Sequence, residues 1–131
     1  MERSVVAEFG RRKVVLLDSI SSVDPADGGH VVVSGSHGGR SAAVFTMCVP
    51  TALCCFNDAG VGKDGAGIAA LALLDGCDLA AVACSHASAR IGEARDTWES
   101  GVIAHVNAAA SRRGLCVGEG VQAAVRRVFG T

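Results

Sequence analysis

Continuous runs of apolar residues, separated by glycine-rich or polar stretches, indicate where strands lie along the chain. The runs are Lys13 to Leu17, His30 to Ser34, Ala52 to Phe56, Leu79 to Cys84 and, as a short last strand, Leu115 to Val117. A strand that is apolar at successive positions is buried on both faces, whereas a half-exposed strand alternates. The pattern therefore predicts a sheet that helices cover on both sides.

The segments between these runs predict the helices, at Arg40 to Met47, Asp64 to Gly76, Thr97 to Arg113 and Glu119 to Val128. Asp64 is placed to cap the second helix, and Gly76 to end it in a left-handed conformation. The third helix begins with Asp96 and Glu99 at capping-box spacing and stops at Gly114. One side of it is apolar, at Val102, Ile103, Val106 and Ala110.

The connections between strands set the expected topology. The turn-rich loop from Ser21 to Gly29 is too short for a helical crossover, so the two strands that flank it should be antiparallel. The strands at 30–34, 52–56 and 79–84 are separated by helices, so they should be parallel neighbours joined by right-handed crossovers. The sequence predicts one α/β domain over residues 1–131. It is a small Rossmann-like three-layer sandwich, with a mostly parallel sheet and an antiparallel N-terminal edge strand.

The amino-acid composition limits the classes of partner that the protein is expected to have. Half of the 131 residues are apolar and only 19% are charged, which is typical of a globular domain and favours a homo-oligomer. The formal net charge is -1 and no basic stripe appears, so we expect no nucleic-acid partner. Residues 1–10 carry charges and no run approaches the ~18 apolar residues of a membrane span, so we expect a cytoplasmic protein without a membrane partner. Four of the six cysteines, Cys54, Cys55, Cys77 and Cys84, lie in or beside apolar segments, which suits buried free thiols in a reducing compartment.

Polar groups gather in the three loops that follow successive strands, residues 34–39, 57–63 and 85–90. Loops at the carboxyl ends of parallel strands meet at one edge of the sheet, where ligands bind. The acid/base candidates are His37, Asp58 and His86, and an active site needs at least two of them within ~7 Å of each other. The candidates for substrate binding are Ser36, Gly38, Gly60, Gly62, Lys63, Ser85 and Arg90.

The first loop, Gly35 to Gly39, exposes backbone amides next to the imidazole of His37. Such a loop suits an oxyanion or phosphate at a helix N-terminus, and His37 could move a proton near neutral pH. The alternative is a tight turn whose histidine bonds to a backbone carbonyl.

The second loop, Asp58 to Asp64, resembles a P-loop but fails its pattern twice. Asn57 stands where the first glycine is needed, and Asp64 replaces the hydroxyl that would hold magnesium. We therefore expect no ATP or GTP binding, although a smaller anion remains possible. Asp58 is either a general base or a residue that organises the loop. Lys63 suits a solvated or anion-pairing role better than a Schiff base.

The third loop holds Ser85, His86 and, one helical turn further on if the loop becomes helical, Arg90. Arg90 is the best candidate to pair with a carboxylate or phosphate. Cys84 and His86 alone are a weak ligand pair, so we expect no metal. A serine–histidine–aspartate triad could be drawn from Ser36, His86 and Asp58, but the GxSxG pattern that positions such a serine is absent.

Three segments carry a resemblance to a known family: VSGSHGG at 33–39, DAGVGKDGAGI at 58–68, and AVACSHASAR at 81–90 followed by Arg95 and Asp96. Together they resemble the ribose-5-phosphate isomerase B and galactose-6-phosphate isomerase family over roughly residues 31–107. The family's catalytic cysteine position corresponds to Asn57, and its ring-opening histidine falls near Cys84, two residues before His86. The resemblance implies the fold and an anion-binding sheet edge.

These observations favour a small cytosolic enzyme that acts on a small phosphorylated or carboxylated metabolite. The reaction would be proton transfer, as in an isomerase or lyase, and it would need no cofactor. Two alternatives remain at this stage. One is a non-catalytic binding or structural subunit of a larger complex, and the other is a small hydrolase.

Overall fold

The computed structural model describes residues 3–130 as one α/β domain. The strands are β1 (Arg3–Phe9), β2 (Arg12–Leu17), β3 (Val31–His37), β4 (Leu53–Asn57), β5 (Ala81–Cys84) and β6 (Ile103–Val106). The α-helices are α1 (Arg40–Met47), α2 (Ala69–Asp75), α3 (Ala94–Ser100), α4 (Ala108–Arg112) and α5 (Val121–Phe129). Short 3-10 helices occur at η1 (Ile20–Ser22), η2 (Pro25–Asp27) and η3 (Lys63–Ile68).

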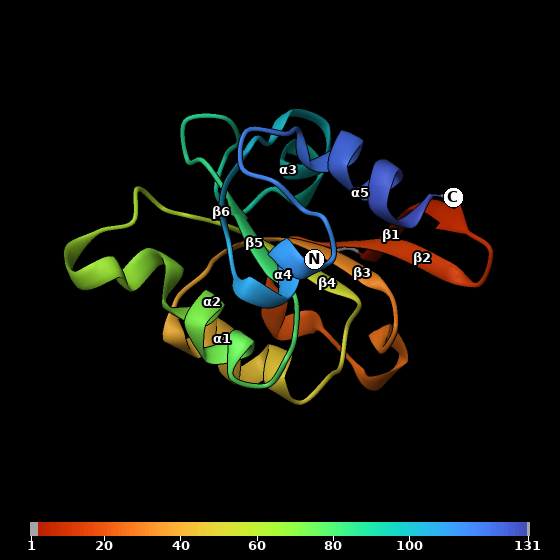
Figure 1. Ribbon diagram of the computed structural model, residues 1–131, viewed down its shortest axis with the longest axis horizontal. Coiled ribbons are helices and arrows are strands. Elements are labelled where there is room, and N and C mark those ends of the chain that lie inside the picture. Colours follow the sequence, from red (N-terminus) through yellow and green to blue (C-terminus); the bar gives the residue numbers. More distant parts are fainter. Residues whose placement is uncertain (1–2, 131) are drawn as a thin grey trace.

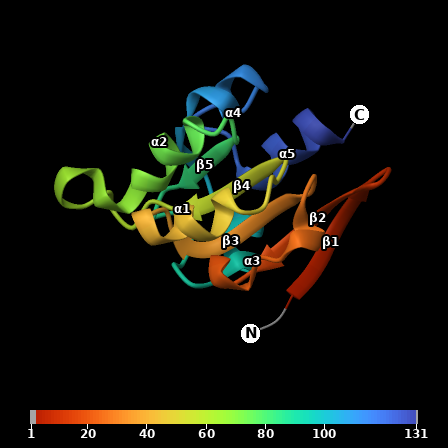
Figure 2. The same cartoon turned by 90° about the horizontal axis from the view of Figure 1, so that it is seen from below.

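The six strands form one sheet in the order β1-β2-β3-β4-β5-β6. Strands β2 to β5 are parallel, and β1 and β6 are antiparallel to their neighbours at the two edges. Figure 1 shows α1 and α2 on one side of the sheet and α3 and α5 on the other, and Figure 2 turns the molecule to look from the α1 side. The expected three-layer α/β architecture is confirmed.

Alternate residues of the parallel strands supply two separate cores. Val14, Val31 and Val82 belong to the core beneath α3 and α5, while Val15, Val32 and Phe56 belong to the core beneath α1 and α2. All six side chains are at most 3% exposed. This two-sided burial is the physical reason that the strands read as continuous apolar runs.

The central part of the sheet follows the sequence prediction, and its N-terminal edge does not. Strands β3, β4 and β5 are parallel neighbours, as expected. The predicted antiparallel pairing of the 13–17 and 30–34 strands is wrong, because β2 pairs in parallel with β3. The loop between them crosses one face of the sheet through η1 and η2, and buries Ile20 in the core on the α1 side. The antiparallel edge strand is β1, which the apolar pattern did not indicate.

The predicted helix from Thr97 to Arg113 is also wrong. It divides into α3, the edge strand β6 and α4. Helix α3 ends at Ser100. At the next residue, Gly101, the backbone is extended and a Cβ atom would lie 2.5 Å from the Thr97 carbonyl oxygen. Helix α4 has a new start at Asn107, whose side chain accepts a hydrogen bond from the Ala110 amide. No capping box forms at Asp96, because its carboxylate instead accepts from the Arg90 amide at 2.8 Å.

The structure also differs from the sequence prediction at several ends of helices and strands. Asp64 does not cap a helix, since it lies inside η3 with a φ of 56°. Gly76 is not left-handed, since its φ is -62°. Residues 115–117 form no strand. The terminal helix runs over Val121–Phe129, close to the predicted range.

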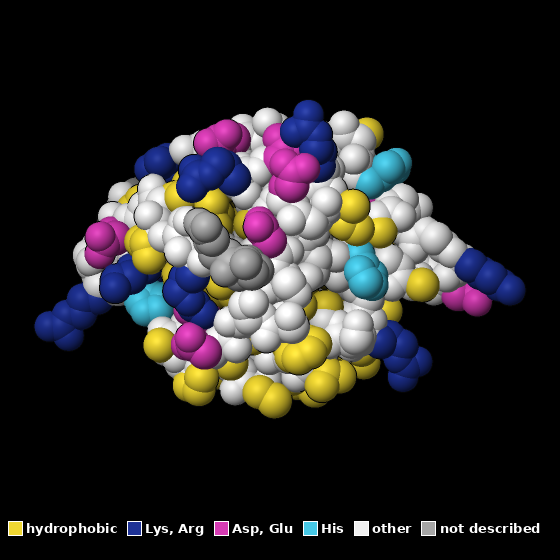
Figure 3. All heavy atoms as spheres, turned by 180° about the vertical axis from the view of Figure 1, so that it is seen from behind, with side chains coloured by type: hydrophobic (Ala, Val, Ile, Leu, Met, Phe, Trp, Pro, Cys, Tyr) yellow, Lys and Arg dark blue, Asp and Glu magenta, His cyan; other side chains and the backbone are white. Residues whose placement is uncertain are grey.

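The outer surfaces of α1 and α2 are unusually apolar. Val44, Phe45 and Met47 on α1 and Leu73 on α2 are more than two-fifths exposed. Figure 3 shows hydrophobic side chains along the lower rim of the molecule, the side on which Figure 1 places these helices. The homo-oligomer stays a prediction. Over residues 3–130 no helix has the length and apolarity to cross a membrane, and the cytoplasmic location also stays a prediction.

Candidate active site

Asp58 is the centre of the site. It follows β4 directly, and its amide donates to the Cys84 carbonyl at 2.9 Å, so the backbone continues the pairing between β4 and β5. The residue is only 5% exposed. Its Oδ1 accepts from the amides of Gly60 and His86, both at 2.9 Å. These two donors fix the carboxylate against the ends of both strands.

Two imidazoles also meet the Asp58 carboxylate, one at each oxygen. His86, which follows β5, places Nδ1 3.2 Å from Oδ1. His105, on β6, places Nε2 3.2 Å from Oδ2. The His86 side chain is well exposed, while that of His105 is 29% exposed. The result is a continuous histidine–aspartate–histidine chain that joins the ends of β4 and β5 to a residue within β6.

The contacts of Asp58 decide its charge. Burial raises the pKa of a carboxyl group, but here the amides of Gly60 and His86 and the two imidazoles more than offset it, so the pKa of Asp58 lies below its ordinary value. Asp58 is therefore ionised at neutral pH and acts as an acceptor for both rings. An imidazole that donates Nδ1–H to a carboxylate presents its Nε2 as a base, which is the arrangement of His86.

A cavity of about 360 Å³ lies on the His86 side of the carboxylate. It is lined by His86, Ala87, Ser88, Ala89, Arg90, Asp96 and Ser100. The guanidinium of Arg90 is exposed and has a carboxylate neighbour in Glu93, at the long distance of 3.9 Å. An imidazole and a weakly paired guanidinium thus share one cavity, and the anion site stays a prediction.

A second cavity, of about 490 Å³, lies on the His105 side between α2 and β6. Its walls are mostly apolar, with contributions from Ile68, Leu71, Val106 and Val117. The side chain of Asn107, which also lines it, is committed to the carbonyls of Leu71 and Leu79. Asp58 therefore separates a polar cavity from an apolar one and holds one imidazole toward each.

The loop after Asp58 has a strained backbone. Positive φ angles occur at Ala59, Gly60, Val61, Gly62, Asp64 and Gly65. Three of these are not glycine, and a β-branched residue such as Val61 is a clear outlier at a φ of 68°. The amides of Gly60, Val61 and Gly62 already donate to Asp58 or to Gly60, so an anion could reach them only by displacing these bonds.

The first glycine loop is built differently. Gly35 and His37 belong to β3, which runs to His37. The Ser36 hydroxyl accepts from the Ile20 amide at 2.9 Å, and the Gly38 amide donates to the Asn57 carbonyl at 3.1 Å. His37 is exposed and lies opposite Asn57 in the β3–β4 register, one strand away from Asp58, and no hydrogen bond joins its ring to Asp58.

Among the remaining predicted site residues, some have structural hydrogen bonds and others are exposed. The Ser85 hydroxyl accepts from the Ala87 amide, which shapes the turn before the cavity. Lys63 is exposed at the start of η3. Asn57 is fully buried and bridges the Ala89 carbonyl and the Ala59 amide. Cys84 is buried in β5, and residues 3–130 contain no group of three or more side chains arranged to hold a metal.

His105 is the one member of the site that the sequence did not indicate. The sequence pattern predicted a helix for the segment that contains His105. In the structure this segment is a strand, and the His105 side chain lies on the same face of the sheet as that of Ala83. The glycine before Val102 and Ile103, together with Asn107 as a helix start, was the available signal for a strand here.

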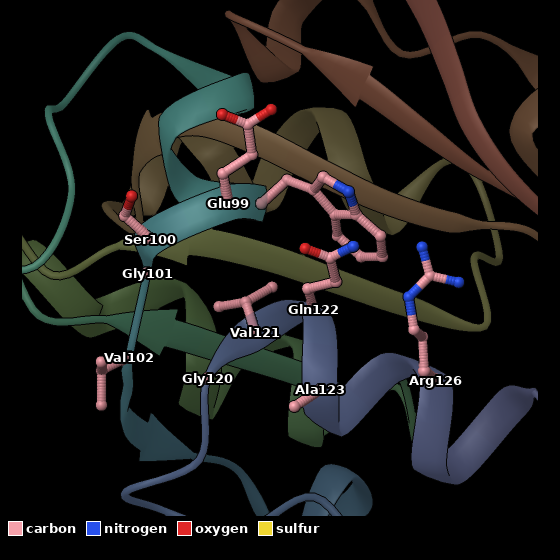
Figure 4. A pocket seen from close by; sticks show the side chains of 10 residues that line it. Glu99, Ser100, Gly101, Val102, Gly120, Val121, Gln122, Ala123 and Arg126 are labelled. Atoms are coloured by element: carbon pink, nitrogen blue, oxygen red, sulfur yellow. The ribbon is translucent and has the colours of Figure 1, made fainter.

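Another cavity, of about 410 Å³, lies where α3 ends and α5 begins (Figure 4). In Figure 4, Gln122 and Arg126 point from α5 toward α3, and Glu99 points away from them. The Arg126 guanidinium lies 5.7 Å from the ring centre of the buried Trp98. This cavity holds no histidine or cysteine and has no contact with Asp58.

Comparison of the chain with protein-family models, with curated proteins and with solved structures finds no significant match. The resemblance to the ribose-5-phosphate isomerase B family therefore stays a prediction. The function has to be argued from the geometry around Asp58.

Proposed function

We propose that this protein is an enzyme that transfers protons on a small anionic metabolite, in an isomerase- or lyase-like reaction that needs no cofactor. The observation that carries the proposal is the buried, ionised Asp58 with an imidazole on each oxygen. Of the three acid/base candidates, Asp58 and His86 lie 3.2 Å apart, which satisfies the proximity that proton transfer requires.

His86 is the base in this mechanism. Its Nδ1–H is donated to Asp58, so its Nε2 is left to take a proton from a carbon beside a carbonyl group of the substrate. The Asp58 carboxylate stabilises the imidazolium that forms and does not itself become protonated. In an isomerase, His86 then returns the proton to the former carbonyl carbon, while the proton of the neighbouring hydroxyl group passes through solvent to the former carbonyl oxygen. In a lyase, His86 gives the proton to the leaving group, which departs as a double bond forms.

Arg90 binds the anionic group of the substrate, because it shares the 360 Å³ cavity with His86 and its ion pair with Glu93 is long, at 3.9 Å. A phosphate or carboxylate suits the planar guanidinium, which offers two parallel donors. His105 is a positioning residue: its bond to Oδ2 keeps Oδ1 directed at His86. His37, one strand away, is the candidate for a second contact to the substrate.

The test uses proton exchange with solvent, which reports on the chemistry before the substrate is known. The protein is incubated in D2O with a panel of small sugar phosphates and hydroxycarboxylates, and deuterium incorporation is measured by mass spectrometry. We expect exchange into at least one compound. His86→Asn should lower the exchange rate by ~100-fold or more. Arg90→Met should weaken binding of that compound by roughly 1.5–3 kcal/mol.

His30→Asn is the matched control, because His30 precedes β3 at the opposite edge of the sheet and accepts from the Lys13 amide. It should exchange at the wild-type rate. If no compound exchanges, or if His86→Asn exchanges as fast as the wild type, the acid/base mechanism is wrong and the non-catalytic binding subunit becomes the better interpretation.

A further inference from the structure

We propose a second anion-binding site at the edge of the sheet opposite Asp58, formed by Arg12 and Arg113 and suited to the phosphate group of a small metabolite. Both arginines line a cavity of about 300 Å³, together with Gly29, Pro50, Thr51, Ala52 and Phe129. The register of the parallel strands places Val14, Val31 and Leu53 side by side. The cavity therefore lies at the amino ends of β2, β3 and β4, and the proposal is independent of the proposed reaction.

The two guanidinium groups are held in place by neutral partners. Arg12 donates from Nε to the Gly29 carbonyl at 3.0 Å, and its head lies 5.2 Å from the centre of the Phe129 ring. Arg113 donates from Nη1 to the Ala52 carbonyl at 3.0 Å. Carbonyl oxygens orient the two heads without cancelling their charge. Each head keeps further N–H donors for another acceptor.

No acidic side chain in the lining of this cavity balances the charge of the two arginines. None of its lining residues is acidic, and neither Arg12 nor Arg113 forms an ion pair within residues 3–130. The preceding residue, Arg112, differs from Arg113, since it pairs with Asp78 at 2.7 Å. Figure 3 shows Lys and Arg side chains, with acidic side chains among them, around the end of the molecule formed by the β1–β2 turn. Two positive charges in one cavity favour an anion, and a dianionic group most.

Thr51 supplies an independent observation. The residue is 3% exposed and lines the same cavity. Its Oγ1 is the one buried side-chain oxygen or nitrogen in the described part of the chain without a hydrogen-bond partner. A buried hydroxyl without a partner is costly and rare, so it calls for an explanation. A rotation of the Thr51 side chain toward the cavity would let this hydroxyl donate to a phosphate oxygen held between the two guanidinium groups.

The chemistry of the cavity identifies the ligand class. Paired guanidinium groups match the oxygens of a phosphate, and a hydroxyl donor adds a third bond. Pro50, Ala52 and the Phe129 ring give the cavity an apolar side that a free ion would not use. A phosphate monoester with a small organic group fits both features.

The test is a phosphate titration of the uniformly ¹⁵N-labelled protein, with chloride at equal ionic strength as the reference. We expect saturable shifts of the Gly29, Thr51 and Ala52 amides, and tighter binding of glycerol phosphate than of inorganic phosphate at the same amides. Arg12→Met and Arg113→Met should each weaken binding about tenfold, which is the usual effect of one charge-assisted bond. Arg11→Met is the matched control, since Arg11 is exposed in the β1–β2 turn beside Arg12 and does not line the cavity.

Thr51→Val keeps the proposal testable if an arginine variant folds poorly. Without ligand it should be at least as stable as the wild type, because the hydroxyl it removes has no partner. With phosphate it should bind several-fold more weakly. The proposal is overturned if phosphate causes saturable shifts only around residues 86–90, or if the Arg12, Arg113 and Thr51 variants all bind phosphate as the wild type does. Binding of inorganic phosphate without glycerol phosphate would overturn the monoester class.

Discussion

The two glycine-rich segments at the carboxyl ends of β3 and β4 look alike in the sequence and differ in the structure. In the first, residues 34–39, no residue has a positive φ, and its glycines serve close packing. In the second, residues 57–65, six residues have positive φ angles, and the loop wraps the carboxylate of Asp58. The difference teaches that glycine content alone does not indicate a site. Backbone strain gathers where a functional group is held.

Gly35→Ala should produce the largest effect, because it tests the packing role of the first loop. A Cβ atom there would lie 2.5 Å from both the Gly92 carbonyl carbon and the Glu93 amide nitrogen, which are backbone atoms that cannot turn aside. We expect a loss of about 3 kcal/mol in the free energy of unfolding, measured with urea. Gly76→Ala is the control, since Gly76 has helical angles and ordinary space. Equal stabilities of the two variants would contradict the packing role.

Asp58→Asn should produce the next largest effect, because it removes the charge that the second loop is built around. We expect it to cost about 2 kcal/mol at pH 7. The pKa of Asp58 is lowered in the folded protein, so its contribution is fully present above the unfolded pKa of about 3.9 and is lost as the pH falls through the lower folded pKa. The difference between wild type and variant should therefore shrink below about pH 4 in urea titrations. A difference that stays constant down to pH 2 would show that the charge is not responsible.

Gly62→Ala should have an intermediate effect that isolates backbone conformation. Gly62 has a φ of 74° and nothing lies within 4 Å of the position where a Cβ atom would be. The substitution therefore adds strain without a clash, and we expect a loss of about 1.5 kcal/mol. Thermal unfolding monitored by circular dichroism measures it. A loss as large as that of Gly35→Ala would mean that the two loops do not differ in this way.

Val61→Gly should have the smallest effect, and in the opposite direction. It relieves the strain of a β-branched residue at a φ of 68°, while the greater freedom of glycine in the unfolded chain offsets part of the gain. We expect the protein to be stabilised by less than about 1 kcal/mol in urea unfolding. Destabilisation would indicate that the Val61 side chain makes packing contacts that outweigh the strain.

The sequence was sufficient to predict the arrangement of the middle strands of the sheet and the proximity of two residues of the candidate site. Strands β3, β4 and β5 are apolar on both faces and separated by helices, and these two facts determine their parallel arrangement. The same topology brings Asp58 and His86 together, because they follow neighbouring strands. Local pattern and tertiary structure agree there.

At the edges of the sheet the local pattern was ambiguous. An edge strand is half exposed, so the short stretch around Ile103 to Val106 fits a helical period as well as a strand. The contact of His105 with Asp58 depends on that strand, which explains why the residue was missed. The prediction that the strands now called β2 and β3 are antiparallel was wrong for a related reason. Two 3-10 turns span the sheet in fewer residues than a helix would need, and sequence length alone did not reveal them.

The adjacent cysteines of β4 can report separately on the two faces of the sheet. Successive strand residues face opposite sides, so Cys54 lies in the core beneath α1 and α2, and Cys55 in the core beneath α3 and α5. Burial raises the pKa of Cys54 to about 12 and that of Cys55 well above its ordinary value, so neither is a reactive thiolate at neutral pH. Cys48, Cys77 and Cys116 are exposed and should react with an alkylating reagent at once. The order in which Cys54 and Cys55 react afterwards reports which helical layer lifts from the sheet first.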